Sequence, residues 1–85
     1  SNSNEIIMHK ALIYDLVNEV ELAEIFYEQA LINRQEVSLI NYYLNFLHRN
    51  NKNKKKEQFL QKLYADSNYQ ISINNNILLD KNIIS

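Results

Sequence analysis

The sequence contains neither glycine nor proline, and this restricts the possible folds more than any other feature. Sheet-rich domains of this size usually need several turns built on one of these two residues. Tight turns that require a positive φ must instead fall to asparagine, which tolerates that region better than most residues with a side chain. We therefore predict an all-α chain that turns at asparagine.

Hydrophobic residues recur every three or four positions in four segments, and this spacing places them on one face of a helix. We predict a first helix over 5–17, a turn at 18–20 and a second helix that fades at 33–35. Asn18 stands where a helix usually takes a C-terminal glycine. Two more helices are predicted at 37–47 and 54–65, with the polar run 48–53 between them.

The predicted organisation is a single small domain over 1–85, since 85 residues provide one modest core. It consists of one antiparallel hairpin over 5–33, a second over 37–65 and a capping segment or tail over 66–85. Two alternatives stay open for the last segment. Either it ends in a short capping helix at 77–84, or the alternating residues 69–73 form a strand that pairs with another chain.

The segment 18–31 resembles the second helix of a tetratricopeptide repeat, which shows the same spacing of alanine, aromatic residue and alanine at Ala23, Tyr27 and Ala30. The likeness extends backward, with Asn18 at the turn glycine of the family. Ile7, Ala11 and Tyr14 then stand at its first-helix positions for a large, a small and an aromatic residue. Residues 23–31, with Ile40, Tyr43 and Phe46, also resemble the half-a-tetratricopeptide variant of RNA-processing scaffolds. The likeness covers 5–64.

This resemblance implies that the surface made by the first helix of each hairpin receives an extended or helical peptide. Asparagine side chains can hold a peptide backbone, and methionine adapts its shape to a hydrophobic anchor. The partner-binding residues that the resemblance implies are Met8, Leu12, Leu16, Asn41, Tyr42, Asn45 and Arg49.

Most aromatic residues are interpreted as packing residues, with Tyr14, Phe26, Tyr43, Phe46 and Phe59 inward. Tyr27 and Tyr42 are expected to be the exceptions. Glu24 and Glu28 are expected on the outer face of the second helix, where paired carboxylates are ordinarily solvated rather than catalytic.

The charges are segregated along the chain, although the net charge is only −1. Residues 1–36 carry seven acidic and two basic residues, and residues 37–65 carry six basic and one acidic. Such a distribution favours head-to-tail association between copies, or two differently charged partner surfaces, more than it favours nucleic-acid binding. A basic cluster is also the usual footprint of nucleic-acid binding. If this chain contacts nucleic acid, the candidates are Arg49, Lys52, Lys54, Lys55 and Lys56.

Several classes of site are not expected. The chain has no cysteine and only two histidines, His9 and His48, so we expect no metal site. Without glycine there is no glycine-rich phosphate loop and no nucleophile elbow, so we expect neither a cofactor nor an enzyme. No hydrophobic run approaches the roughly 20 residues that cross a bilayer. We expect a cytoplasmic protein that does not engage membranes.

The leading hypothesis is a non-catalytic adaptor or chaperone-like module that binds a peptide or helix of a partner protein and forms homo-oligomers. The alternative is a fragment of an RNA-processing scaffold or regulator that contacts nucleic acid through the basic segment 49–56.

Overall fold

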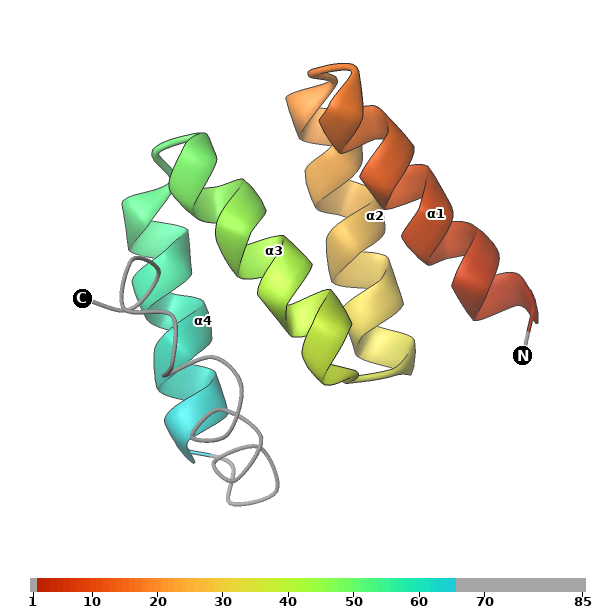
Figure 1. Cartoon of the computed structure of the whole chain (residues 1–85). Helices are drawn as coiled ribbons and strands as arrows, with labels where there is room; N and C mark the ends of the chain where they lie inside the picture. Colours follow the sequence, from red (N-terminus) through yellow and green to blue (C-terminus); the bar gives the residue numbers. More distant parts are fainter. Residues whose placement is uncertain (1, 66–85) are drawn as a thin grey trace. The chain divides into compact units, whose positions relative to one another are not determined.

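The computed structural model describes residues 2–65, which form four helices in sequence: α1 (Asn2–Leu16), α2 (Val20–Asn33), α3 (Val37–Arg49) and α4 (Asn53–Ala65) (Figure 1). Over this range the chain is all-α and contains no strand. None of the four helices is both long enough and hydrophobic enough to cross a membrane. The two alternatives for the segment 66–85 fall outside the described residues.

The chain divides into two compact units, Ser1–Tyr43 and Leu44–Ser85. The first unit contains α1, α2 and the first half of α3. The second contains the end of α3 and α4. The boundary therefore lies within a helix rather than in a loop, and each unit is described separately below.

In the first unit α1 packs along α2 as a hairpin. Three alanines, Ala11 on α1 with Ala23 and Ala30 on α2, have no exposed surface, and small residues of this kind allow two helices to approach closely. Beside them the ring of Tyr14 stacks on that of Phe26, with centroids 5.5 Å apart. Tyr27 also has no exposed surface, so all three residues of the alanine, tyrosine, alanine pattern recognised in the sequence are buried.

Both hairpins turn in the same way, at an asparagine with left-handed backbone. Asn18 has φ 65° and Asn51 has φ 58°. After α1 the amide of Asn18 donates to the carbonyl of Asp15 at 3.2 Å, and the amide of Glu19 donates to that of Tyr14 at 2.8 Å. This pair of bonds defines a Schellman motif, which satisfies carbonyl groups left over at a helix end.

The turn after α3 has the same pair of backbone hydrogen bonds as the turn after α1. The amide of Asn51 donates to His48 at 3.1 Å, and that of Lys52 donates to Leu47 at 2.9 Å. The side chain of Asn50 adds a bond to the carbonyl of Phe46 at 2.9 Å. Asparagine therefore replaces glycine at both turns, as the composition predicted.

These motifs reveal a register of 33 residues between the two hairpins. Asn18 and Asn51 are 33 positions apart, as are the last residues of α1 and α3 and the first residues of α2 and α4. In this register hydrophobic positions correspond to one another. Ile7 corresponds to Ile40, Ala11 to Leu44, Tyr14 to Leu47, Phe26 to Phe59 and Ala30 to Leu63. The two hairpins are thus built on one plan with different side chains.

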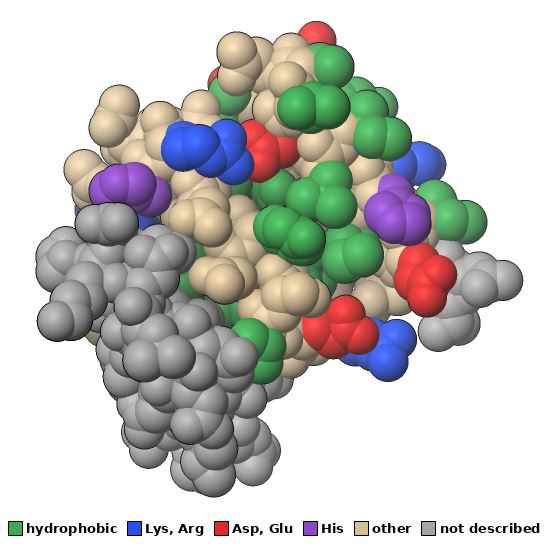
Figure 2. All heavy atoms as spheres, in the orientation of Figure 1, with side chains coloured by type: hydrophobic (Ala, Val, Ile, Leu, Met, Phe, Trp, Pro, Cys, Tyr) green, Lys and Arg blue, Asp and Glu red, His purple; other side chains and the backbone are tan. Residues whose placement is uncertain are grey.

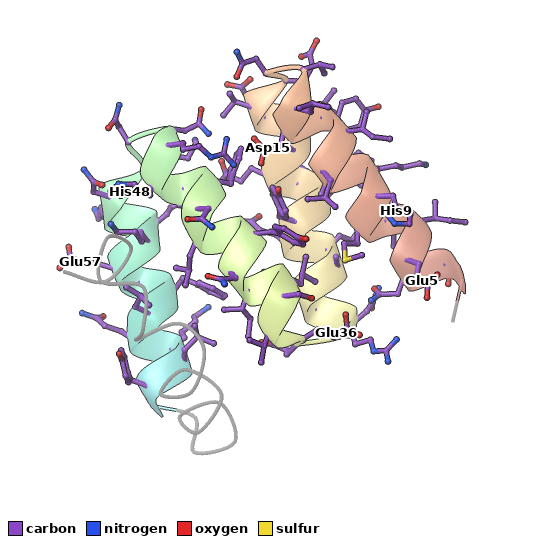
Figure 3. The ribbon with its side chains drawn as sticks, viewed as in Figure 1. Glu5, His9, Asp15, Glu36, His48 and Glu57 are labelled. Carbon is purple, nitrogen blue, oxygen red and sulfur yellow. The ribbon has the colours of Figure 1, made fainter. Side chains whose placement is uncertain are left out.

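In the second unit the buried residues are Leu44, Phe46 and Leu47 on α3 and Leu63 on α4. Phe59 and Leu60 on α4 are half-buried. The ammonium group of Lys56 lies 3.2 Å from Nδ1 of His48, joining the start of α4 to the end of α3. His48 and Glu57 mark these two helices in Figure 3.

Candidate partner-binding surface

The predicted binding residues of α1, namely Met8, Leu12 and Leu16, are spaced four apart and therefore share one face of the helix. Met8 and Leu12 are half-buried, whereas Leu16 is 85% exposed. No other large hydrophobic side chain on the described part of the chain is as exposed. Figure 2 shows hydrophobic side chains gathered around His9 on the side of the molecule formed by α1 and α2, and Figure 3 labels His9.

The predicted binding residues of α3 also lie on one side of their helix. Asn41, Asn45 and Arg49 are spaced four apart, and Tyr42 lies next to Asn41. Tyr42 is 44% exposed and Arg49 is exposed, whereas both asparagines are half-buried. This face is therefore polar and aromatic, in contrast to the hydrophobic face of α1.

The two sets coincide in the 33-residue register. Met8 corresponds to Asn41, Leu12 to Asn45 and Leu16 to Arg49, and His9 takes the place of Tyr42. Each hairpin therefore presents the same face of its first helix, with a hydrophobic lining on α1 and an amide-rich lining on α3. We use the name partner face for these two sets of register-equivalent residues: Met8, Leu12 and Leu16 on α1, and Asn41, Tyr42, Asn45 and Arg49 on α3.

Asn41 shows one unusual feature. Its Oδ1 atom is buried and has no hydrogen-bond partner. A buried acceptor without a donor costs about 1–3 kcal/mol of desolvation free energy. The atom has almost no accessible surface, so a bound ligand could not reach it in this conformation, and the unmet hydrogen bond is a cost to the fold rather than evidence for a ligand.

The predicted basic segment lies at the end of α3, in the turn and in the first turn of α4. Lys54 and Lys55 are exposed, whereas Lys52 and Lys56 are half-buried. No acidic residue occupies the first turn of α4. Lysines at a helix start oppose the helix dipole, which favours acids there, by roughly 0.3–1 kcal/mol each.

Two tyrosine and carboxylate pairs are present that the sequence reasoning did not anticipate. The hydroxyl group of Tyr27 on α2 donates to Oδ2 of Asp15 on α1 at 2.7 Å. The hydroxyl group of Tyr43 on α3 donates to Oε2 of Glu28 on α2 at 3.1 Å. The two rings meet with centroids 5.8 Å apart. These contacts join the three helical segments of the first unit.

The environment of Tyr43 changes its acidity. Burial in the protein, the negative charge of Glu28 and the hydrogen bond to Glu28 all raise the pKa of Tyr43 well above its usual value. Each effect disfavours the phenolate, and burial is the largest.

Two expectations about single side chains were wrong. Tyr27, expected to be an exception to inward packing, is fully buried. Glu24, expected on the outer face of α2, is also buried, whereas Glu28 is exposed as expected. Of the aromatic residues expected inward, Tyr43 and Phe46 are buried, and Tyr14, Phe26 and Phe59 are half-buried. The ammonium group of Lys10 lies 5.7 Å from the ring centroid of Phe26. The burial of Tyr27 could have been predicted from the sequence, because Tyr27 lies between Ala23 and Ala30 on the side of α2 that packs closely. A buried tyrosine hydroxyl usually requires a hydrogen-bond partner.

Within residues 2–65 no three histidine, cysteine, aspartate or glutamate side chains are grouped so that they could hold a metal ion. Glu5 precedes His9 by one helical turn on α1, a pairing that the sequence reasoning overlooked (Figure 3). Two possible ligands alone do not make a metal site.

No protein-family model matches the chain, and no curated protein or solved structure matches it either.

Proposed function

We propose that this chain is a non-catalytic, tetratricopeptide-like module of the adaptor or chaperone type, which uses the partner face to bind a peptide or helix of another protein. The observation that carries the proposal is the 33-residue register. It relates two hairpins with identical turns and brings the residues implied by the resemblance to equivalent positions on α1 and α3.

The chemistry of the partner face defines the ligand that it would suit. On α1 the exposed Leu16 offers a hydrophobic contact, and Met8 and Leu12 extend it along the helix. On α3 the half-buried Asn41 and Asn45 carry amide groups, which can both donate to and accept from a peptide backbone. A ligand with hydrophobic side chains and free backbone amides satisfies both requirements, and an extended peptide has both.

The test is a screen of displayed peptides against the protein, followed by affinity measurement with the peptide selected. Tyr42→Ala and Asn45→Asp should each weaken binding about tenfold or more, as expected for residues that contact the ligand directly. The matched control is Ile32→Ala, which removes an exposed hydrophobic side chain from α2. Far-UV circular dichroism should show equal helicity in all variants. Unchanged affinity in both partner-face variants would contradict the proposal.

A second candidate function is nucleic-acid binding through Arg49, Lys52, Lys54, Lys55 and Lys56. The observation that favours it is the placement of lysines at the start of α4, where they oppose the helix dipole. A cluster of lysine and arginine side chains is the arrangement from which proteins make phosphate contacts.

This alternative makes a separate prediction. Affinity for a generic single-stranded RNA should fall steeply with added salt, because phosphate binding releases counterions. Lys54→Ala combined with Lys55→Ala should remove binding, whereas Lys62→Ala near the end of α4 should change it little. Absence of RNA binding at low salt would rule this function out.

A further inference from the structure

One face of α1 carries two exposed isoleucines on either side of a lysine, whereas the equivalent face of α3 is buried. We call Ile6, Lys10 and Ile13 the stacking face. Ile6 is 53% exposed and Ile13 is 58% exposed, and Lys10 lies between them. In the 33-residue register these residues correspond to Leu39, Tyr43 and Phe46 of α3, all of which are buried.

The first unit shows what this kind of face contacts. Tyr43 on α3 lies against Tyr27 and donates to Glu28, both on the preceding helix α2. Through Tyr43, α3 therefore uses this face to pack on α2, the second helix of the hairpin before it. α1 has the corresponding face, and its two isoleucines are exposed in the described part of the chain. Hairpins of this type need stacked neighbours to bury their hydrophobic faces.

The charges at the turns indicate which helix is suited to this face. Glu19 and Glu21 follow the first turn, and the residues at the equivalent positions of the second turn are Lys52 and Lys54. In a stack of hairpins of equal length, equivalent turns lie along the same edge. If the second hairpin of one copy stacked before the first hairpin of another, these acidic and basic positions would be adjacent.

We infer that the stacking face of one copy binds α4 of a second copy, in a head-to-tail arrangement. α4 offers Leu60 and Tyr64 at the positions that Tyr27 and Leu31 occupy on α2. Tyr64 is exposed and Leu60 is half-buried, whereas Tyr27 and Leu31 are buried. The contact therefore places Ile6 and Ile13 against Leu60 and Tyr64, and an acidic turn beside a basic turn. It uses a side of α1 different from the partner face, so it is independent of the proposed function.

The experiment is analytical ultracentrifugation of the 85-residue chain over a concentration series up to about 0.5 mM, a range that detects weak association. The wild-type protein should form dimers and longer species at low salt, and added salt should weaken them. Ile6→Glu combined with Ile13→Glu should weaken association at least about tenfold. A protein that stays monomeric throughout the range would overturn the inference.

The control is Ile25→Glu on α2. The exposed fraction of Ile25, 55%, is similar to that of Ile13. The residue equivalent to Ile25 on α4 is the exposed Gln58. This position therefore lies outside the stacking contact in both hairpins. This variant should associate as the wild type does. If it weakened association as much as the Ile6 and Ile13 variant, a different surface would be responsible and the inference would be wrong.

A charge exchange tests the direction of assembly even if the hydrophobic variant fails to fold. Glu19→Lys with Glu21→Lys makes both turns basic, and Lys52→Glu with Lys54→Glu makes both acidic. Each variant alone should be monomeric, and an equimolar mixture should recover association because every contact is again between opposite charges. A mixture that remains monomeric would refute the head-to-tail arrangement. The arrangement would also be refuted if the wild-type protein did not self-associate and instead bound a basic helix of an unrelated protein.

Discussion

At the scale of single residues, the two buried tyrosines are the least expected feature of the molecule. Tyr27 and Tyr43 each combine a ring in the core with a hydroxyl group that reaches a carboxylate. Sequence periodicity assigns a side chain to a face but does not identify the partner of a polar atom. The tyrosine positions could be predicted as candidates for packing, whereas the choice of Asp15 and Glu28 depends on how neighbouring helices align.

The bond between Tyr27 and Asp15 should contribute measurably to stability. Tyr27→Phe removes the hydroxyl group and leaves the half-buried carboxylate of Asp15 without this donor, at an expected cost of about 1–2 kcal/mol in the free energy of unfolding. Urea denaturation followed by circular dichroism measures this. Tyr42→Phe, which removes an exposed hydroxyl group, should change stability by less than about 0.5 kcal/mol. Equal effects of the two variants would contradict the assigned role.

Tyr43 should make the fold sensitive to alkaline pH. Its pKa is raised in the folded protein, so the folded chain retains this proton after the unfolded chain has lost it at about the usual value of 10.0. The associated stabilisation is therefore complete below pH 10 and is lost as the pH rises above it. Thermal unfolding from pH 8 to 11.5 should show a shallower alkaline decline for Tyr43→Phe than for wild type. The exposed-site control, Tyr42→Phe, should follow the wild type. Parallel curves for wild type and Tyr43→Phe would argue against the prediction.

At the scale of elements, the sequence predicted four helices and their order from the three- and four-residue spacing of hydrophobic residues and from asparagine at the turns. α1 begins three residues earlier than predicted, and α3 continues to Arg49, so the link to α4 is shorter than the polar run 48–53 suggested. Both errors have one cause. Polar residues such as Ser3, His48 and Arg49 end the hydrophobic pattern, but they do not end a helix whose backbone bonds are still satisfied.

The turn asparagines provide a test at this scale. Asn18→Gly should leave stability unchanged or raise it, because glycine adopts the left-handed region without a side-chain clash. Asn18→Ala should lower the free energy of unfolding by about 1 kcal/mol. The same pair of changes at Asn51 should give the same order. Asn33→Ala, within α2, serves as the control and should not destabilise. The prediction fails if alanine and glycine are equivalent at position 18.

At the scale of the whole molecule, acidic residues are concentrated in the first hairpin and basic residues in the second. The chain has a net charge of −1 and an isoelectric point near 6.1, yet its basic residues gather at the second turn and its acidic residues around the first. This segregation was readable from the sequence by counting. That the opposite charges occupy equivalent positions became visible only with the structure, because the 33-residue register depends on where the helices end.

Segregated charge should be detectable by chromatography. Near neutral pH this slightly acidic protein should bind a sulfonate cation exchanger at low salt through Lys54 and Lys55, which are exposed. Lys54→Ala with Lys55→Ala should elute much earlier, whereas Lys62→Ala should shift elution only slightly. Flow-through of the wild-type protein at low salt would disprove the prediction.

The candidate surface was only partly accessible to sequence reasoning. The tetratricopeptide resemblance implied the residues of the partner face, whose binding role stays a prediction, and in each set these residues share one side of their helix. The stacking face was not identified, because Ile6 and Ile13 resemble ordinary core residues in a periodic pattern. Only a comparison of their exposure with that of Leu39 and Phe46 distinguishes an open face from a closed one.

The shared design of the two turns also bears on how such a protein can grow. The segment 20–52 starts with the first residue of α2 and stops just before α4. A tandem duplication of this segment would join Lys52 to Val20, a junction that reproduces the passage from a turn into a second helix already present twice in the chain. Lengthening by 33 residues would therefore require no new type of connection, and genetic duplication or deliberate engineering could extend the protein one unit at a time.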